Sequence, residues 1–145
     1  MSSFGPHLLA GVCVGGVGTI ATCCLATNFN WLCGLPFVAG VAGALTPDMD
    51  IKSKSSMFMY LLFTVSAISL FLTGYTGWAF LLLLYSLIPQ FFGHRGFIHS
   101  FVFGLISTVG LGFVCHYNNV DMDIAAGIMA TYFFGFLSHI ALDEA

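Results

Sequence analysis

Charged residues are scarce in this sequence. Its 145 residues include three Lys or Arg and six Asp or Glu, so charged side chains make up 6% of the chain, against about 25% in an ordinary soluble domain. A soluble fold needs a polar surface to cover its core, and so few charges cannot provide one. We therefore expect a membrane protein, with the lipid bilayer as the solvent for most of its surface.

Positively charged residues are even fewer than negatively charged ones. Only Lys52, Lys54 and Arg95 are basic, so the sequence has no basic stripe that could follow a phosphate backbone, and nucleic acid is not an expected partner. The five cysteines lie in or beside apolar runs without C-x-x-C spacing. We expect them to be buried, reduced thiols rather than a disulfide framework or a zinc knuckle.

Polar linkers and internal repeats are also lacking, which predicts one integral membrane domain over residues 1–145. Apolar residues form six stretches, at 7–27, 31–45, 57–73, 77–91, 97–115 and 124–142. The expected fold is all-α, a polytopic bundle of about six apolar helices. Two stretches, 31–45 and 77–91, are short for a span of roughly 20 residues, so whether they cross completely stays open.

Glycine marks two features of this bundle. The apolar region 57–91 is too long for one span and must fold back, and Gly74 and Gly77 favour a turn there. Gly11 and Gly15 form a G-x-x-x-G pair, and Gly40 and Gly43 follow in the next stretch. Small residues at such spacing let helix backbones approach closely inside a membrane.

The crossing count predicts which segments share a side. If all six stretches span, both termini and the connections 46–56 and 92–96 face the same side. All three basic residues fall on that side, and positive charge favours the cytoplasm. We therefore expect a multi-pass protein with both termini cytoplasmic.

Histidine and aspartate gather on this same side. His7 begins the first stretch, Thr46-Pro47-Asp48-Met49-Asp50 follows the second, and His94 and His99 flank a short turn before the fifth. His139 and Asp143 stand four residues apart, on one face of the last helix. Ionisable groups at the edge of a membrane are costly, so their convergence calls for a reason.

A shared metal ion is the reason we favour. The candidate ligands are His7, Asp48, Asp50, His94, His99, His139 and Asp143. Imidazole and carboxylate ligands suit Zn²⁺ first, with Mn²⁺ or Fe²⁺ as alternatives, and this many ligands fits one ion or two. Arg95 is a candidate phosphate clamp, Ser100 a candidate donor behind the ligands, and Asp48 or Asp50 a candidate general base.

Each element also has a structural interpretation. The Pro47-Asp48 turn could cap a helix, His139 and Asp143 could form a hydrogen-bonded pair, and His7 could cap the first helix. His116, near Asp121 and Asp123, is expected in a solvated loop on the opposite side. These alternatives remain open at the level of the sequence.

The order of these motifs resembles a known family. His7, then Pro47-Asp48-Met49-Asp50, then His94-Arg95-Gly96-Phe97-Ile98-His99-Ser100, then Ser138-His139 with Asp143 is similar to bacterial inner-membrane metal-dependent hydrolases, also labelled LexA-regulated membrane-bound hydrolases. The segment from His94 to Ser100 is the most specific part. Thr46 and Met49 depart from the pattern, since apolar residues are expected at both places.

This resemblance implies an inner-membrane hydrolase, distantly similar to zinc phospholipase C type phosphoesterases. The expected function is metal-dependent hydrolysis of a phosphoester or lipid-linked substrate at the cytoplasmic face. Two alternatives remain: a cation or proton transporter or relay, and a non-catalytic structural membrane protein. The sequence indicates neither the substrate nor an oligomeric state.

Overall fold

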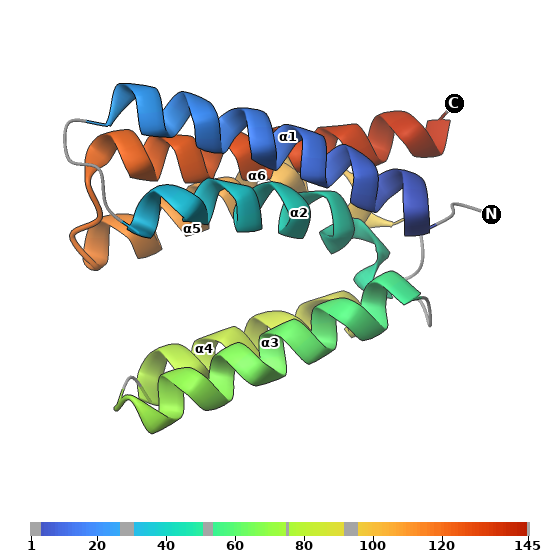
Figure 1. Cartoon of the computed structure of the whole chain (residues 1–145). Helices are drawn as coiled ribbons and strands as arrows, with labels where there is room; N and C mark the ends of the chain where they lie inside the picture. The colour runs from blue at the N-terminus through green and yellow to red at the C-terminus, as the bar shows by residue number, and fades with distance from the viewer. Residues whose placement is uncertain (1–3, 27–30, 51–53, 75, 92–95, 145) are drawn as a thin grey trace.

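Six α-helices build the protein in the computed structural model, which describes residues 4–26, 31–50, 54–74, 76–91 and 96–144. The described residues contain no strand, so the expected all-α fold is confirmed (Figure 1). The helices are α1 (Phe4–Leu25), α2 (Leu35–Leu45), α3 (Lys54–Leu72), α4 (Thr76–Leu87), α5 (Phe101–Tyr117) and α6 (Met122–Glu144). Short 3₁₀ turns flank them: η1 (Trp31–Gly34), η2 (Thr46–Asp50), η3 (Ile88–Phe91) and η4 (Phe97–His99).

The predicted turn between α3 and α4 is present, and α5 starts later than predicted. Gly74 ends α3 with a φ of +89°, a conformation that glycine adopts without strain, so the predicted fold-back is confirmed. The apolar stretch predicts a fifth helix from residue 97, but α5 starts at Phe101. Ser100 has an extended backbone and its hydroxyl accepts a hydrogen bond from the Phe103 amide, so it caps α5 and leaves His99 in the preceding turn.

Close backbone contact joins α1, α2 and α6. A Cβ added at Gly40 would lie 2.7 Å from the Gly15 Cα, and one added at Gly11 would lie 2.9 Å from the Ala44 Cβ. On the other side of α2, Gly43 lies against the Tyr132 carbonyl and Gly135 against the Gly40 carbonyl. These contacts confirm the prediction that the glycines bring helix backbones together.

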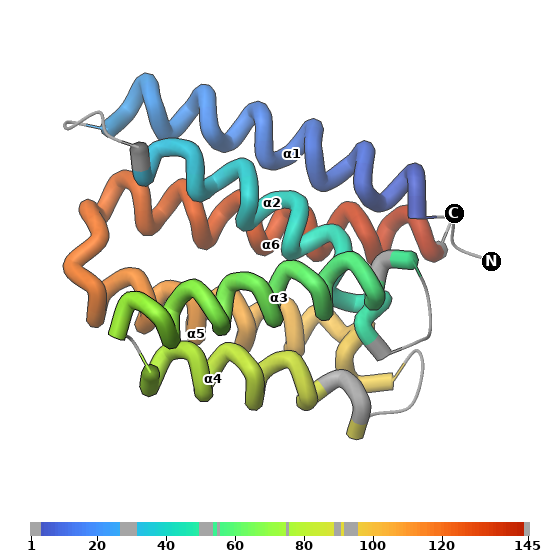
Figure 2. Tube along the Cα trace, turned by 60° about the horizontal axis from the view of Figure 1, so that its bottom comes forward, coloured from blue at the N-terminus to red at the C-terminus, as the bar shows by residue number. Residues whose placement is uncertain are grey.

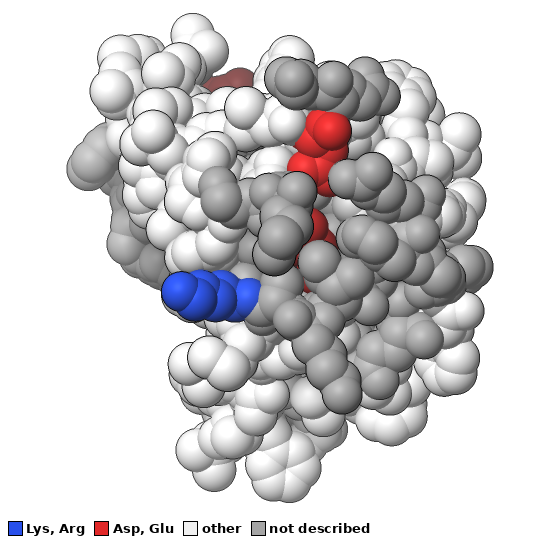
Figure 3. Space-filling model, turned by 90° about the vertical axis from the view of Figure 1, so that its right-hand side faces the viewer, with Lys and Arg blue, Asp and Glu red and all other residues white. Residues whose placement is uncertain are grey.

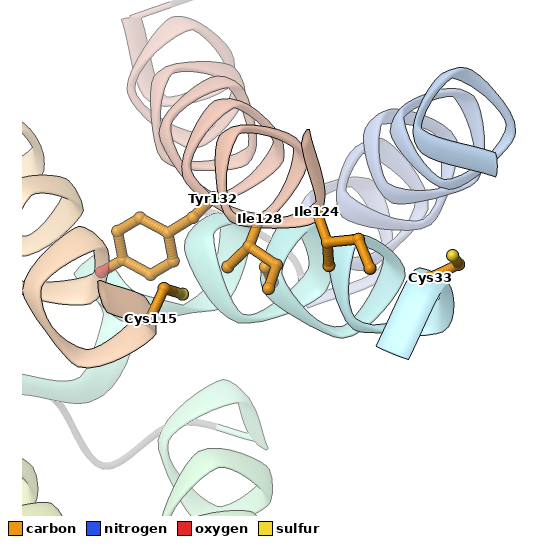
Figure 4. Close-up of a cluster of buried hydrophobic side chains, with 6 residues drawn as sticks. Cys33, Cys115, Ile124, Ile128 and Tyr132 are labelled. Carbon is orange, nitrogen blue, oxygen red and sulfur yellow. The ribbon is translucent and has the colours of Figure 1, made fainter. Parts of the chain in front are cut away.

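A hydrophobic cluster fills the end of the bundle where α5 ends and α6 begins. It consists of Cys33, Ala39, Cys115, Ile124, Ile128 and Tyr132 (Figure 4). Cys33 and Cys115 are therefore buried free thiols, as expected. Cys13 and Cys24 are exposed on α1, because that helix packs on one side only, and for them the expected burial is wrong.

The outer surface is apolar. Leu9, Leu72, Phe113 and Met122 are each more than 60% exposed, which suits contact with lipid rather than water. Three segments are long and apolar enough to cross a membrane, Phe4–Leu25, Leu32–Met49 and Met122–Asp143, and three shorter apolar helices accompany them. The two stretches predicted to be short correspond to α2 and α4. The 3₁₀ turns on either side of α2 extend it to an apolar segment of 18 residues.

The α3–α4 hairpin forms a layer of its own. Figures 1 and 2 show it beside the layer of α1, α2 and α6, with the two layers joined near η2. The Tyr85 hydroxyl on α4 lies 3.2 Å from the Tyr132 hydroxyl on α6 and ties the hairpin to the bundle. At the far end, the Trp78 and Tyr117 rings meet edge to face, 5.4 Å apart.

Candidate metal centre

Histidine and aspartate side chains meet at the end of the bundle where α1 begins and α6 ends. Both chain termini lie at this end (Figures 1 and 2), and a view onto it shows acidic atoms at the surface (Figure 3). Four elements supply the side chains: His7 from α1, Asp48 from η2, His99 from η4, and His139 with Asp143 from α6. Residues from the whole length of the chain thus converge on one place.

His139 is at the centre of the cluster. Its Nε2 atom lies 3.4 Å from Oδ2 of Asp143, one helical turn further along α6, and 3.5 Å from Oδ1 of Asp48. The His139 side chain is fully buried and Asp48 is 2% exposed. One ring nitrogen therefore faces two carboxylates with no solvent around it.

Two more imidazoles complete the group. His99 Nε2 lies 3.7 Å from Oδ2 of Asp143, and His7 Nε2 lies 3.3 Å from Oδ1 of the same carboxylate. The His7 ring also stacks on the His139 ring, with centroids 3.9 Å apart. Asp143 thus presents one oxygen to His7 and the other to His99 and His139.

A backbone carbonyl fixes the tautomer of His139. Its Nδ1 atom lies 2.7 Å from the Ala44 carbonyl oxygen, which can only accept, so Nδ1 carries the hydrogen and donates it. In a neutral ring, Nε2 then bears a lone pair. A lone pair that faces two carboxylates is repulsive unless a proton or a metal cation lies between them, and metal-bound histidines are oriented by such an outer hydrogen bond.

The spacing of these atoms fits a metal ion better than direct hydrogen bonds. Within the described part of the chain, the buried Nε2 of His139 has no hydrogen-bond partner, and its distances to the carboxylates exceed the usual range of about 2.7–3.2 Å. Ligands bound to tetrahedral zinc at about 2.0–2.1 Å lie about 3.3–3.4 Å apart. Asp48, His99, His139 and Asp143 each offer a ligand atom, all within 4.8 Å of one another.

The negative charge of the cluster also favours a bound metal ion. With neutral imidazoles, Asp48 and Asp143 bring two negative charges into a group in which Asp143 is only 12% exposed. Buried charge without compensation is costly, above all near a membrane. One divalent cation would neutralise this pair, so the donor set fits such an ion in number, chemistry and charge.

Several predicted site residues fall outside this geometry. His94 and Arg95 lie outside the described residues, as does the Asp50 side chain, although the backbone of Asp50 belongs to η2. Ser100 donates to the Phe97 carbonyl and caps α5, so its known contacts are local ones. His116 is exposed at the opposite end of the bundle, but it belongs to the last turn of α5 rather than to the expected loop.

Sequence reasoning did not identify the Ala44 carbonyl as part of the site. Backbone carbonyls carry no residue-specific signal, so no pattern could have pointed to it. The only related signal is the small size of Gly40, Gly43 and Ala44, which predicts close packing but not a bond to His139.

The fold and the cluster define the class of this protein, which is an apolar helical membrane protein with a His/Asp cluster at one end of the bundle. The family model described as YdjM inner membrane protein matches residues 1–145. The chain belongs to this inner-membrane protein family. No curated protein and no solved structure matches the chain.

Proposed function

We propose that this protein is a metal-dependent hydrolase of the inner membrane that acts on a phosphoester or lipid-linked substrate at the cytoplasmic face. The observation that carries the proposal is His139, whose Nδ1 is held by the Ala44 carbonyl while Nε2 faces two carboxylates, the buried Asp48 and the half-buried Asp143. A divalent ion there, zinc first, would act as a Lewis acid and supply hydroxide at neutral pH.

The residues of the chain have distinct roles in this proposal. His139, His99, Asp143 and Asp48 would hold the ion. Asp143 also faces His7, so the residues fit one ion or two. A carboxylate that is not fully used as a ligand, Asp48 or Asp50, accepts a proton from the attacking water. Arg95 holds the phosphoryl oxygens through its planar fork.

The position of the site favours a lipid-linked substrate. His7 lies in the first turn of α1 and His139 and Asp143 in the last turns of α6, both long apolar helices. Asp48 and His99 lie in the turns η2 and η4 at the same end of the bundle. If all six helices span, this depth is that of the lipid headgroups, where a phosphoester attached to a lipid would lie. Lys54, at the start of α3 on the same side, is suited to contact with headgroups.

Metal analysis together with hydrolysis tests the proposal. Detergent-purified protein should carry at least one transition metal per chain, and His99→Ala or His139→Ala should lose most of it, whereas His116→Ala should keep it. The wild type should hydrolyse a member of a panel of phosphomonoesters, phosphodiesters and phospholipids. Equal metal content in all three variants would refute the site, and no hydrolysis across the panel would refute the enzyme.

Arg95→Lys separates catalysis from metal binding. This variant should keep the metal content of the wild type while kcat/KM falls by an amount on the order of 2–4 kcal/mol, as is typical when a transition-state donor is lost. Full activity in Arg95→Lys would remove Arg95 from the mechanism.

A proton or cation relay is the second candidate, and a row of buried and half-buried hydroxyls favours it. The Tyr132 hydroxyl lies 3.5 Å from Thr46 Oγ1 and 3.2 Å from the Tyr85 hydroxyl, which lies 3.5 Å from Ser107 Oγ. However, Thr46 donates its hydrogen to the Ala42 carbonyl at 2.7 Å, so the row ends on the backbone rather than on Asp48. Proton or metal flux into liposomes would support this candidate if hydrolysis were absent.

A further inference from the structure

The turn that carries Asp48 is buried from Thr46 to Met49. Thr46 and Met49 are each 1% exposed, and Pro47 is also fully buried. A buried 3₁₀ turn is short and has few hydrogen bonds of its own, so its remaining backbone groups need partners from elsewhere. This need is greatest in a membrane protein, where water does not reach the backbone.

A tyrosine from another helix supplies one such partner. The Tyr60 hydroxyl, on α3, donates a hydrogen bond of 2.9 Å to the carbonyl oxygen of Met49, the residue after Asp48. On the other side of Asp48, the Thr46 hydroxyl donates to the Ala42 carbonyl at 2.7 Å. Two side-chain hydroxyls therefore hold the backbone before and after this aspartate.

The ring of Tyr60 is fixed by packing. It lies against the buried cluster of Leu45, Met49 and Met59, which joins the end of α2, the η2 turn and α3. A packed aromatic ring has few rotamers, so its hydroxyl is held in one place at little entropic cost. Thr46 thus holds the turn through its hydroxyl, and Met49 fills this cluster.

We infer that Tyr60 is a positioning residue, which holds the η2 turn so that Asp48 meets His139 across the metal position. The inference rests on the proposed metal site and extends it to α3, which supplies none of the ligands found among the described residues. Asp48 Oδ1 lies 3.5 Å from His139 Nε2, and metal ligation tolerates shifts of only about 0.2 Å. A small displacement of the turn therefore weakens binding.

Tyr60→Phe tests this role, because it keeps the packed ring and removes only the hydroxyl. Zinc affinity, measured by competition with a chromophoric chelator, should fall about 10- to 100-fold, as is typical for the loss of an outer partner of a metal site. In Co²⁺-loaded protein the visible absorption bands should shift, because they report ligand geometry.

Tyr85→Phe is the matched control. It removes a tyrosine hydroxyl from the same hairpin, but one that contacts Tyr132 and Ser107 and reaches the ligand turn only indirectly, through Tyr132 and Thr46. It should keep the zinc affinity and the Co²⁺ spectrum of the wild type. Thermal unfolding of the metal-free forms shows whether the two variants differ in general stability.

The outcomes are distinct. Wild-type affinity and an unchanged spectrum in Tyr60→Phe would overturn the inference while leaving the metal site intact. An equal loss in Tyr85→Phe would overturn it as well, because the effect would then be one of stability. A wild-type protein that binds neither zinc nor Co²⁺ would refute the proposed function itself.

Discussion

The ring of His7 stacks on the ring of His139, with centroids 3.9 Å apart and planes 20° from parallel. The two residues come from the first and last helices, so the cluster exists only if α1 and α6 both pack closely on α2. Glycines at Gly15, Gly40 and Gly43 make that packing possible. Helix packing and the candidate site therefore depend on the same few residues.

Gly43→Ala should disturb both. A Cβ at Gly43 would run into the Tyr132 carbonyl, a backbone atom of α6 that cannot move aside alone. We expect a loss of stability on the order of 1–3 kcal/mol, as is typical of overpacking, together with weaker metal binding because α6 carries two of the ligands. Denaturation in mixed detergent measures the stability loss, and chelator competition measures the loss of metal affinity.

Gly16→Ala is the control for this change. Gly16 has open space around its Cβ position, and alanine is the better helix former, so stability should stay the same or rise. If Gly43→Ala proved as stable as Gly16→Ala, the close approach of α2 and α6 would be wrong.

The effect of Asp143→Asn on stability should change sign between the metal-free and the zinc-bound protein. Asp143 and Asp48 lie close together, so without a cation they repel each other across neutral imidazoles. At pH 8 in a chelator, the variant should therefore unfold at the same temperature as the wild type or higher. With zinc at 100 times its dissociation constant, the wild type gains about 2.7 kcal/mol and should be the more stable protein.

Asp123→Asn gives the comparison for this test. Asp123 is an exposed residue in the first turn of the same helix, at the end away from the cluster. Its variant should respond to zinc as the wild type does. An Asp143→Asn protein that gained as much stability from zinc as the wild type would exclude Asp143 as a ligand.

The helices and their close contacts could be predicted from the sequence because both depend on composition over many residues. Apolar stretches give helices in lipid whatever their neighbours are, and small residues such as Gly11 and Gly15 can only mark close approach. The i, i+4 spacing also placed His139 and Asp143 on one face, and their ring and carboxylate meet in the structure. These inferences needed no knowledge of the tertiary arrangement.

The rotation of each helix could not be predicted. A helix that is apolar all round gives no signal for the face that turns inward, so nothing in the sequence showed that His7 would stack on His139. The Tyr60 contact with Met49 joins residues from different elements and leaves no periodic pattern. The start of α5 was missed because the local hydrogen bond of Ser100 outweighs an apolar stretch that continues through it.

Topology gives the last prediction, because the proposed cytoplasmic site was placed on a bundle in which all six helices cross the membrane. The weakest case is α4, whose 12 residues extend only about 18 Å at 1.5 Å per residue, against roughly 30 Å of hydrocarbon. We expect it to cross with help from η3 and from local thinning of the bilayer, since the outer surface of the hairpin is apolar along its length.

Reporter fusions after residues 50 and 75 measure this directly. The first follows the ligand turn and should report the cytoplasm, where Lys52, Lys54 and Arg95 favour retention, and the second should report the opposite side. Fusions at both termini should agree with residue 50. If residues 50 and 75 reported the same side, α3 would not cross, and His99, which follows the hairpin, would have to reach Asp143 from a different topology.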